Sequence, residues 1–231
     1  MAARSGRRPG FLDGSGMGSG QPKTGKGDSG PAGASASPPG NGGTGKPNSY
    51  LSGQLLIAMP TMRDPRFART VIYLCAHNAD GAMGLVVNRL IGSLSYTDLL
   101  KQLGFEGTSS EDNRKVHFGG PVETSRGFVL HSADKLEEGS LLVDNEVALT
   151  STTDILRSIV AGDGPTRSIL ALGYAGWGPG QLDAELQANS WLHVSADKEL
   201  LFDPDLETKW TRALAKIGVN LGMLSGEAGH A

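Results

Sequence analysis

The stretch of this chain that most restricts its fold is the apolar run SILALGYA, residues 168–175, with the glycine-rich segment GWGPG directly after it. A strand that is apolar on both faces must be covered on both faces, so we expect it at the centre of a sheet. The glycines predict a tight turn into a helix over 180–191. Such turns often bind phosphate, but Pro179 removes one amide, and Asp183 and Glu185 place negative charge in the first helical turns. The segment therefore favours an uncharged or cationic ligand.

The rest of the folded part predicts a mixture of strands and helices without a regular repeat. Short β-branched or apolar runs bounded by turn residues indicate about eight strands. They are expected at 54–60, 70–78, 84–88, on either side of the Gly-Gly-Pro turn in 115–132, and at 140–151, 168–175, 191–197 and 198–202. Helices are expected at 93–105, 151–164, 180–191 and 204–219, the last capped by Asp203. This mixed order predicts an α+β domain over residues 48–231.

Residues 1–47 differ in composition from the rest of the chain. They contain 14 of the 34 glycines and 6 of the 12 prolines. Such a segment cannot bury enough apolar surface to offset its chain entropy, so we expect a disordered Gly/Pro/Ser-rich tail. Six basic and two acidic residues give it a charge of about +4, which leaves about −7 for the domain because the chain totals −3. An acidic domain is a poor platform for phosphates, so direct DNA binding is disfavoured.

Location and cofactors follow from what the sequence contains. Cys75 is the only cysteine, so no internal disulfide can form, and a reducing compartment is expected. No apolar run has the length of a membrane span, and we therefore predict a cytoplasmic protein without membrane contact. GNGGTGKP matches the start of a phosphate-binding loop, but Pro47 replaces the hydroxyl residue that holds magnesium. No cofactor is predicted.

The sequence also lacks the motifs of common catalytic centres. It has no Gly-x-Ser-x-Gly elbow, and no His-Glu-x-x-His or paired Cys-x-x-Cys indicates a metal site. We therefore assign no catalytic residue and no metal ligand. Candidate ligand-binding residues are polar, glycine or aromatic side chains at predicted strand ends and turns. They are Asp64, His77, Asn88, Gly119, Gly120, His131, Tyr174, Trp177, Gln181 and Asp183.

Three long motifs occur together in this chain. LSGQLLIAMPTMRDPRFARTVIYLCAHNADGAMGLVVN, VHFGGPVETSRGFVLH and ALGYAGWGPGQLDAELQANSWL together resemble the AlgH/YqgE family of bacterial proteins, whose function is uncharacterised. The resemblance covers residues 50–225. It implies a single compact domain with a curved, barrel-like sheet, mixed and mostly antiparallel, flanked by about four helices. Ala76 and Asp183 stand where the family usually has Glu.

Three functional hypotheses follow. The favoured one is a non-enzymatic regulatory domain that binds a protein or small molecule of unknown identity, because the family's name links it to a regulator of alginate synthesis and no catalytic motif is present. The second is an enzyme, perhaps hydrolytic, that uses Asp64, His77, Asn88, His131 or Asp183. The third is a DNA-binding transcriptional regulator whose basic tail supplies contacts.

Overall fold

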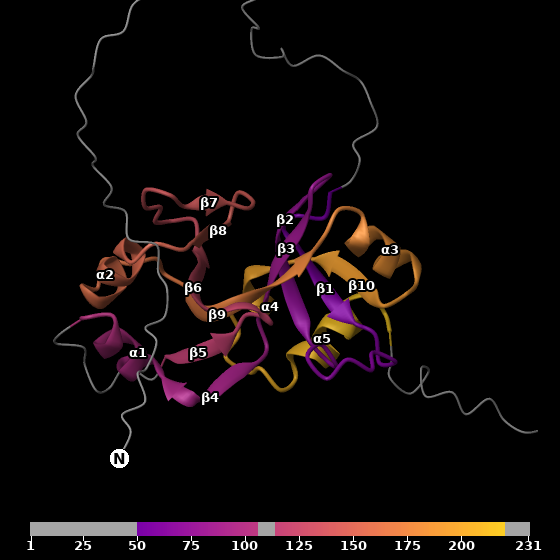
Figure 1. Cartoon of the computed structure of the whole chain (residues 1–231), viewed down its shortest axis with the longest axis horizontal. Coiled ribbons are helices and arrows are strands. Elements are labelled where there is room, and N and C mark those ends of the chain that lie inside the picture. The colour runs from indigo at the N-terminus through magenta and orange to yellow at the C-terminus, as the bar shows by residue number, and fades with distance from the viewer. Residues whose placement is uncertain (1–49, 106–113, 220–231) are drawn as a thin grey trace, which may run out of the picture. The chain divides into compact units, whose positions relative to one another are not determined.

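A computed structural model describes residues 50–105 and 114–219 of the chain. The tail predicted over residues 1–47 lies outside these described ranges. Ten strands and five helices occur in the described part, in an irregular order that confirms the α+β prediction (Figure 1). None of these helices is long and apolar enough to cross a membrane.

The strands form one curled sheet in the order β10-β1-β2-β3-β9-β6-β8-β7, with β5 also paired to β9 and β4 to β5. Their bounds are β1 Gln54–Ala58, β2 Val71–Asn78, β3 Gly81–Val86, β4 Leu90–Ser95, β5 Lys115–Phe118, β6 Val122–Ser132, β7 Leu141–Leu142, β8 Val147–Thr150, β9 Ser168–Trp177 and β10 Trp191–Ser195. Among the described strands, the pairing of β5 with β9 is parallel and the others are antiparallel. The mixed, mostly antiparallel, curved sheet is thereby confirmed.

Strand β9 lies at the centre of this sheet, as its apolar sequence predicts. Its first half, from Ser168 to Leu172, runs between β5 and β6, whereas Ala175–Trp177 pairs with β3. The change of partner occurs around Gly173, whose φ is +73° and whose substitution by any L residue would put Cβ 2.4 Å from the carbonyl oxygen of Gly120. In Figure 1, β9 accordingly runs from the half containing β5–β8 to the half containing β1–β3. The strand thus has two ends in different surroundings.

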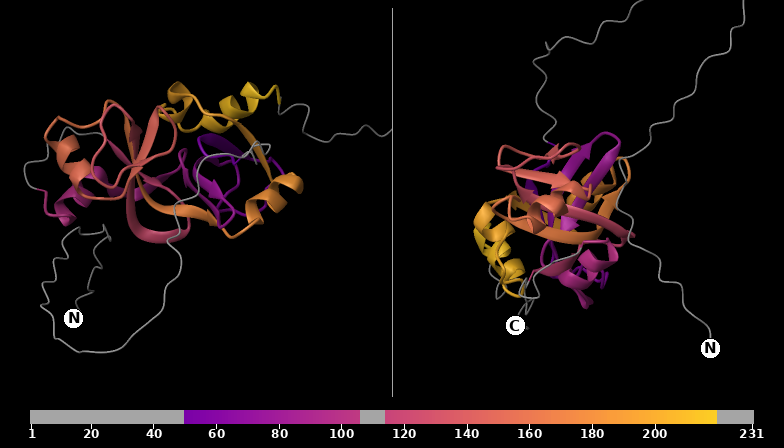
Figure 2. Two further views of the ribbon diagram at one scale, coloured as in Figure 1. Left: turned by 90° about the horizontal axis from the view of Figure 1, so that it is seen from above. Right: turned by 90° about the vertical axis from the view of Figure 1, so that its left-hand side faces the viewer.

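The helices cover the sheet in three groups. Their bounds are α1 Tyr96–Gln102, α2 Asp154–Val160, α3 Gln181–Gln187, α4 Lys198–Leu201 and α5 Lys209–Lys216. Helices α4 and α5 pack with Leu55 and Ile57 of β1, whereas α3 packs Leu182 with Leu56 and Ala58. Because side chains alternate along a strand, α3 and the α4–α5 pair lie on opposite faces, as Figure 2 shows. Helices α1 and α2 share a third core with β5, β6 and the first half of β9.

Two predictions near the C-terminus are wrong. Residues 198–202 were expected to be extended, but Asp197 accepts a hydrogen bond from the Leu200 amide at 2.6 Å and so caps the short helix α4. The last helix begins at Lys209 and not at Pro204. Asp203 instead accepts the amide of Asp205, and this local bond holds a turn where a helix was predicted.

Candidate functional site

The C-terminal end of β9 brings together four of the predicted site residues. Trp177 ends the strand, Gln181 and Asp183 lie on α3, and His77 on β2 faces Asp183. We call these residues, together with Glu185 and Trp191, the α3 cluster. The glycine-rich sequence places the helix here because Gly180, at the N-cap of α3, has a φ of +68°. The predicted turn from central strand to helix is therefore confirmed.

Glu185 is the centre of the α3 cluster. Its Oε2 accepts hydrogen bonds from the indole nitrogens of Trp177 at 2.9 Å and Trp191 at 2.8 Å. Its Oε1 accepts one from the Gln181 amide at 2.8 Å, and Gln181 Oε1 in turn accepts the amide of Gly178 at 3.0 Å. The two indole rings meet edge to face, with centroids 5.9 Å apart. These polar groups satisfy one another, so the network fixes α3 on the sheet.

His77 belongs to the same closed arrangement. It is 7% exposed, and its Nδ1 accepts the backbone amide of Leu51 at 3.2 Å. This bond places the proton of the neutral ring on Nε2, which faces Asp183 Oδ2 at 3.6 Å. The edge of the Tyr50 ring lies against the imidazole, with centroids 5.3 Å apart. Nδ1 of His77 is therefore hydrogen-bonded within the protein, whereas the contact of Nε2 with Asp183 is longer than a hydrogen bond.

Asp64 and Asn88 lie in loops and hold the backbone in place. Asp64 accepts hydrogen bonds from the backbone and the guanidinium of Arg66, and these bonds lower its pKa. Asn88 joins both sides of the segment before β2, since its Oδ1 accepts the Val71 amide at 2.8 Å and its Nδ2 donates to the Arg69 carbonyl at 2.9 Å. Neither residue joins the α3 cluster through a hydrogen bond or ion pair in the described part of the chain.

His131 is enclosed on β6. It is fully buried, and its Nδ1 and Nε2 lie 2.9 Å from the carbonyl oxygen of Ser132 and 2.8 Å from Thr150 Oγ1. Burial lowers the pKa of His131, so the ring is held neutral. Both ring nitrogens of His131 therefore have hydrogen-bond partners within the protein.

Gly119 and Gly120 pack against the backbone of β9. A Cβ on Gly119 would lie 2.2 Å from the carbonyl oxygen of Gly173, and one on Gly120 would lie 2.1 Å from the carbonyl carbon of Tyr174. The Tyr174 ring stands edge to face with Phe128, with centroids 5.8 Å apart. Close packing of two backbones therefore requires glycine at positions 119 and 120.

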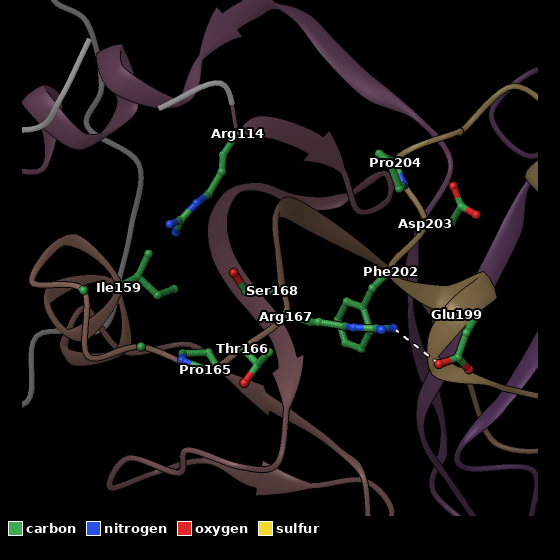
Figure 3. Close-up of a pocket in the computed structure, with 12 residues that line it drawn as sticks. Arg114, Ile159, Pro165, Thr166, Arg167, Ser168, Glu199, Phe202, Asp203 and Pro204 are labelled. Atoms are coloured by element: carbon green, nitrogen blue, oxygen red, sulfur yellow. Dashed lines mark ion pairs between the residues drawn. The ribbon is translucent and has the colours of Figure 1, made fainter. Parts of the chain in front are cut away.

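The N-terminal end of β9 opens into a cleft that the sequence did not predict. It has a volume of about 620 Å³ and lies between the end of α2 and the α4 segment, with Ser168 on its floor (Figure 3). We call it the Ser168 cleft. An inner chamber of about 210 Å³ adjoins it and shares Arg114, Ile159, Ser168, Phe202, Asp203 and Pro204 with it as lining residues. The chamber reaches His117 on β5, and Leu156 and Leu170 supply apolar walls.

His117 is the distinctive polar group of the inner chamber. It is 9% exposed, and its buried Nδ1 has no hydrogen-bond partner within residues 50–105 and 114–219. Burial, reinforced by the positive charge of Lys209, lowers the pKa of His117 to about 4. The ring is therefore neutral at physiological pH. The backbone carbonyl groups of Lys115 and Leu170 act on the same ring and partly oppose this lowering of the pKa.

The mouth of the Ser168 cleft carries charges of both signs. Arg167 Nη1 lies 3.7 Å from Glu199 Oε1, and Figure 3 marks this ion pair with a dashed line. Asp203 is held by Arg212 at 2.6 Å, and its pKa is lowered by the Asp205 amide and by Arg212. Apolar walls with a few convergent polar groups and a perturbed histidine are typical of a small-molecule site.

Sequence reasoning missed this site because no motif contains it. Its walls come from β5, α2, the start of β9 and the segment after α4, which are far apart in the chain. No sequence signal indicates it, because the parallel pairing of β5 with β9, which places Val116 beside Leu170, is seen only in the structure. Across the described ranges, no three His, Cys, Asp or Glu side chains converge as metal ligands.

Comparison with known proteins shows close relatives. The profile of the family described as AlgH-like matches residues 55–222. A UPF0301 protein of Rhodospirillum rubrum is 55% identical over 186 residues, spanning 80% of this chain and 97% of the relative, and one of Nitrobacter hamburgensis is 57% identical over 197 residues, spanning 81% and 91%. The solution structure of the AlgH protein from Pseudomonas aeruginosa is 45% identical, with a TM-score of 0.66 over 81% of this chain and all of that one. A crystal structure from Corynebacterium diphtheriae shares the fold at 18% identity, with a TM-score of 0.60 over 73% of this chain and 88% of that one.

Proposed function

We infer that this chain, which belongs to the AlgH-like family, is a cytoplasmic, non-enzymatic domain that binds a small molecule in the Ser168 cleft. Binding of the ligand regulates a partner indirectly. The observation that carries the proposal is the inner chamber itself, a largely apolar space of about 210 Å³ that reaches the buried, neutral imidazole of His117.

The chemistry of the other histidines supports binding rather than catalysis. A general base needs a nitrogen that can reach a substrate proton. His131 has both ring nitrogens engaged by the protein, and Nδ1 of His77 accepts the Leu51 amide. His117 has a pKa of about 4, which makes it a weak base near neutral pH. The described groups of the site therefore suit recognition of a ligand.

The test is to fill the cleft without changing its surroundings. Ile159 lines both the cleft and the chamber, whereas the next residue, Val160, is exposed and lines neither. We expect Ile159→Trp to lose small molecules that copurify with the full chain from its native host, as measured by mass spectrometry after denaturation. Val160→Trp is the matched control and should retain them. Equal recovery from both variants, or no copurifying compound with the wild type, would contradict the proposal.

A further inference from the structure

Residues 133–147, which contain β7 and the turn into β8, expose several leucines on one short segment. We call this segment the β7 arm. Seven large apolar side chains are exposed within residues 50–105 and 114–219, and three of them, Leu136, Leu141 and Leu142, lie on the arm at 48–50% exposure. Leu141 and Leu142 are neighbours on an edge strand and point to opposite faces, so the described part of the chain leaves both faces of β7 open. Exposed leucines gathered in this way indicate a surface that binds another segment.

The β7 arm is also acidic. Against the single base Lys135 it carries the acids Asp134, Glu137, Glu138, Asp144 and Glu146. Lys198 of α4 lies 3.0 Å from Glu146 and compensates its charge. Glu138 is exposed and has no ion pair within the described ranges. An apolar surface with an excess of negative charge is complementary to a segment that is both apolar and basic.

The chain contains such a segment outside the described residues. It is RRPGFL, residues 7–12. Within residues 1–49, Phe11 and Leu12 are the large apolar side chains apart from two methionines, and Arg7 and Arg8 stand close before them. The other basic residues of the tail have only small or polar neighbours. Charge and apolar surface therefore occur together in this part of the tail.

The described part of the chain starts near the β7 arm. Gly53 lies against Asp144, and a Cβ on Gly53 would be 3.2 Å from Asp144 Oδ2. Tyr50 is at most about 10 Å from Gly53 along the chain. The Gly-rich composition of residues 13–49 corresponds to an r.m.s. span of about 33 Å. The segment at residues 7–12 can therefore reach the arm of its own chain.

We propose that RRPGFL docks on the β7 arm of the same chain, with its Phe-Leu pair against Leu141 and Leu142 and its two arginines facing the acids. The covalent tether gives the segment a high effective concentration, so weak apolar and charge contacts suffice. The arm is then a covered surface, and a partner reaches it by displacing the tail. This inference is independent of the Ser168 cleft and of the ligand proposed there.

Paramagnetic relaxation in the full chain tests the docking. A nitroxide is attached at Gly14→Cys, next to the segment, and Cys75 is buried and therefore protected from the label. The methyl signals of Leu141 and Leu142 should broaden more than those of Leu90, which is exposed on β4. Equal broadening of the three leucines, or no broadening, would overturn the inference.

Variants of the labelled tail show whether its apolar pair holds the contact. The double substitution Phe11→Ser and Leu12→Ser should lower the ratio of docked to free tail about tenfold, because the apolar area buried on the arm is lost. Met17→Ser is the matched control, since it removes an apolar side chain outside the segment, and it should leave the ratio unchanged. Equal broadening in both variants would contradict the proposed contact.

Charge reversal tests the arginines in the same way. Arg7→Glu with Arg8→Glu should lower the docked fraction, and the loss should shrink as salt is added, because exposed charge pairs are screened. Lys23→Glu with Lys26→Glu makes the same change in charge elsewhere in the tail and should have a smaller effect. Equal losses would show attraction to the tail as a whole and would overturn the assignment to residues 7–12.

A mixed sample distinguishes the occupants of the arm. One chain carries the nitroxide without isotopes, and the other carries isotope-labelled methyl groups without the nitroxide. Broadening of Leu141 and Leu142 in this mixture would show that the tail docks on a second copy and would overturn docking within one chain. Broadening that requires both labels on one chain supports the inference.

Discussion

The two ends of β9 have opposite characters. At its C-terminal end, the α3 cluster is closed, and Glu185 satisfies two indoles and one amide. At its N-terminal end, the Ser168 cleft is open and leaves a nitrogen of His117 without a described partner. The C-terminal end of β9 contains the glycine-rich sequence motif, whereas the N-terminal end contains no recognisable motif.

From this difference we expect the α3 end to contribute to stability and the Ser168 cleft to contribute to ligand binding. Satisfied polar networks fix a unique arrangement, whereas an unsatisfied group beside a cavity costs stability and is tolerated where a ligand completes it. We therefore expect changes at the α3 end and its supporting glycines to reduce stability. Changes at the cleft should affect ligand binding and leave stability unchanged or increased. The predictions below follow from this contrast, from the largest expected effect to the smallest.

The largest effect is expected from Gly120→Ala. The added Cβ would lie 2.1 Å from the backbone of Tyr174, at a φ of +155°. Neither backbone can move without disturbing β9, so the free energy of unfolding should fall by more than about 4 kcal/mol. Urea denaturation measures this loss. Gly92→Ala is the control, because a Cβ at Gly92 meets nothing within 4 Å, and a comparable loss there would show that the packing on β9 is not the cause.

The pH dependence of stability should identify His117 as a buried neutral group. Its pKa falls from 6.5 in the unfolded chain to about 4 in the folded one. The folded state therefore binds the proton less readily, and the stability from this group, complete above about pH 6.5, is lost as the pH falls towards 4. The difference in unfolding free energy between His117→Leu and the wild type should widen by about 3 kcal/mol between pH 7.5 and pH 4. A difference that is constant over this range would contradict the assignment.

Glu185→Leu should weaken the α3 end. It leaves two indole N–H groups and the Gln181 amide without their acceptor. A loss of about 2 kcal/mol is expected from urea denaturation. Glu207→Leu changes an exposed residue between α4 and α5 and serves as the control. If both variants lose the same stability, the carboxylate network does not hold α3.

The smallest predicted change in stability, that of His117→Leu, best separates the cleft from the satisfied polar groups elsewhere in the domain. His117→Leu at pH 7.5 should raise the free energy of unfolding by about 1 kcal/mol, because it removes an unsatisfied buried nitrogen. His131→Leu, which breaks the contacts with Ser132 and Thr150, should lower it instead. Opposite signs for the two histidines would support the contrast, and a loss of stability in His117→Leu would contradict it.

The sequence predicted most of the fold because its signals were local. The apolar run of β9 indicated a central strand, and Gly104, with a φ of +85°, follows α1 as predicted. Helix α4 was missed because a single cap at Asp197 outweighed an apolar pattern that suited a strand. Three of the six residues of the α3 cluster, Trp177, Gln181 and Asp183, lie close together because β9 and α3 are adjacent in the chain, and a ligand-binding role for them stays a prediction.

The cleft could not be predicted in this way. His117 and Ser168 are remote in sequence, and pairing of β5 with β9 brings their strands together. Whether an imidazole nitrogen has a partner depends on every segment around it. A sequence pattern therefore cannot indicate that a buried nitrogen lacks a hydrogen-bond partner.

The most direct test of the central contrast is methyl NMR of the full chain, titrated with the small molecules that copurify with it. Chemical shifts of Ile159, Leu156 and Leu170, which line the inner chamber, should change as these molecules are added. Those of Leu182 and Leu186, which pack at the α3 end, should stay constant. Shifts confined to Leu182 and Leu186 would contradict the account and place the binding site at the opposite end of β9.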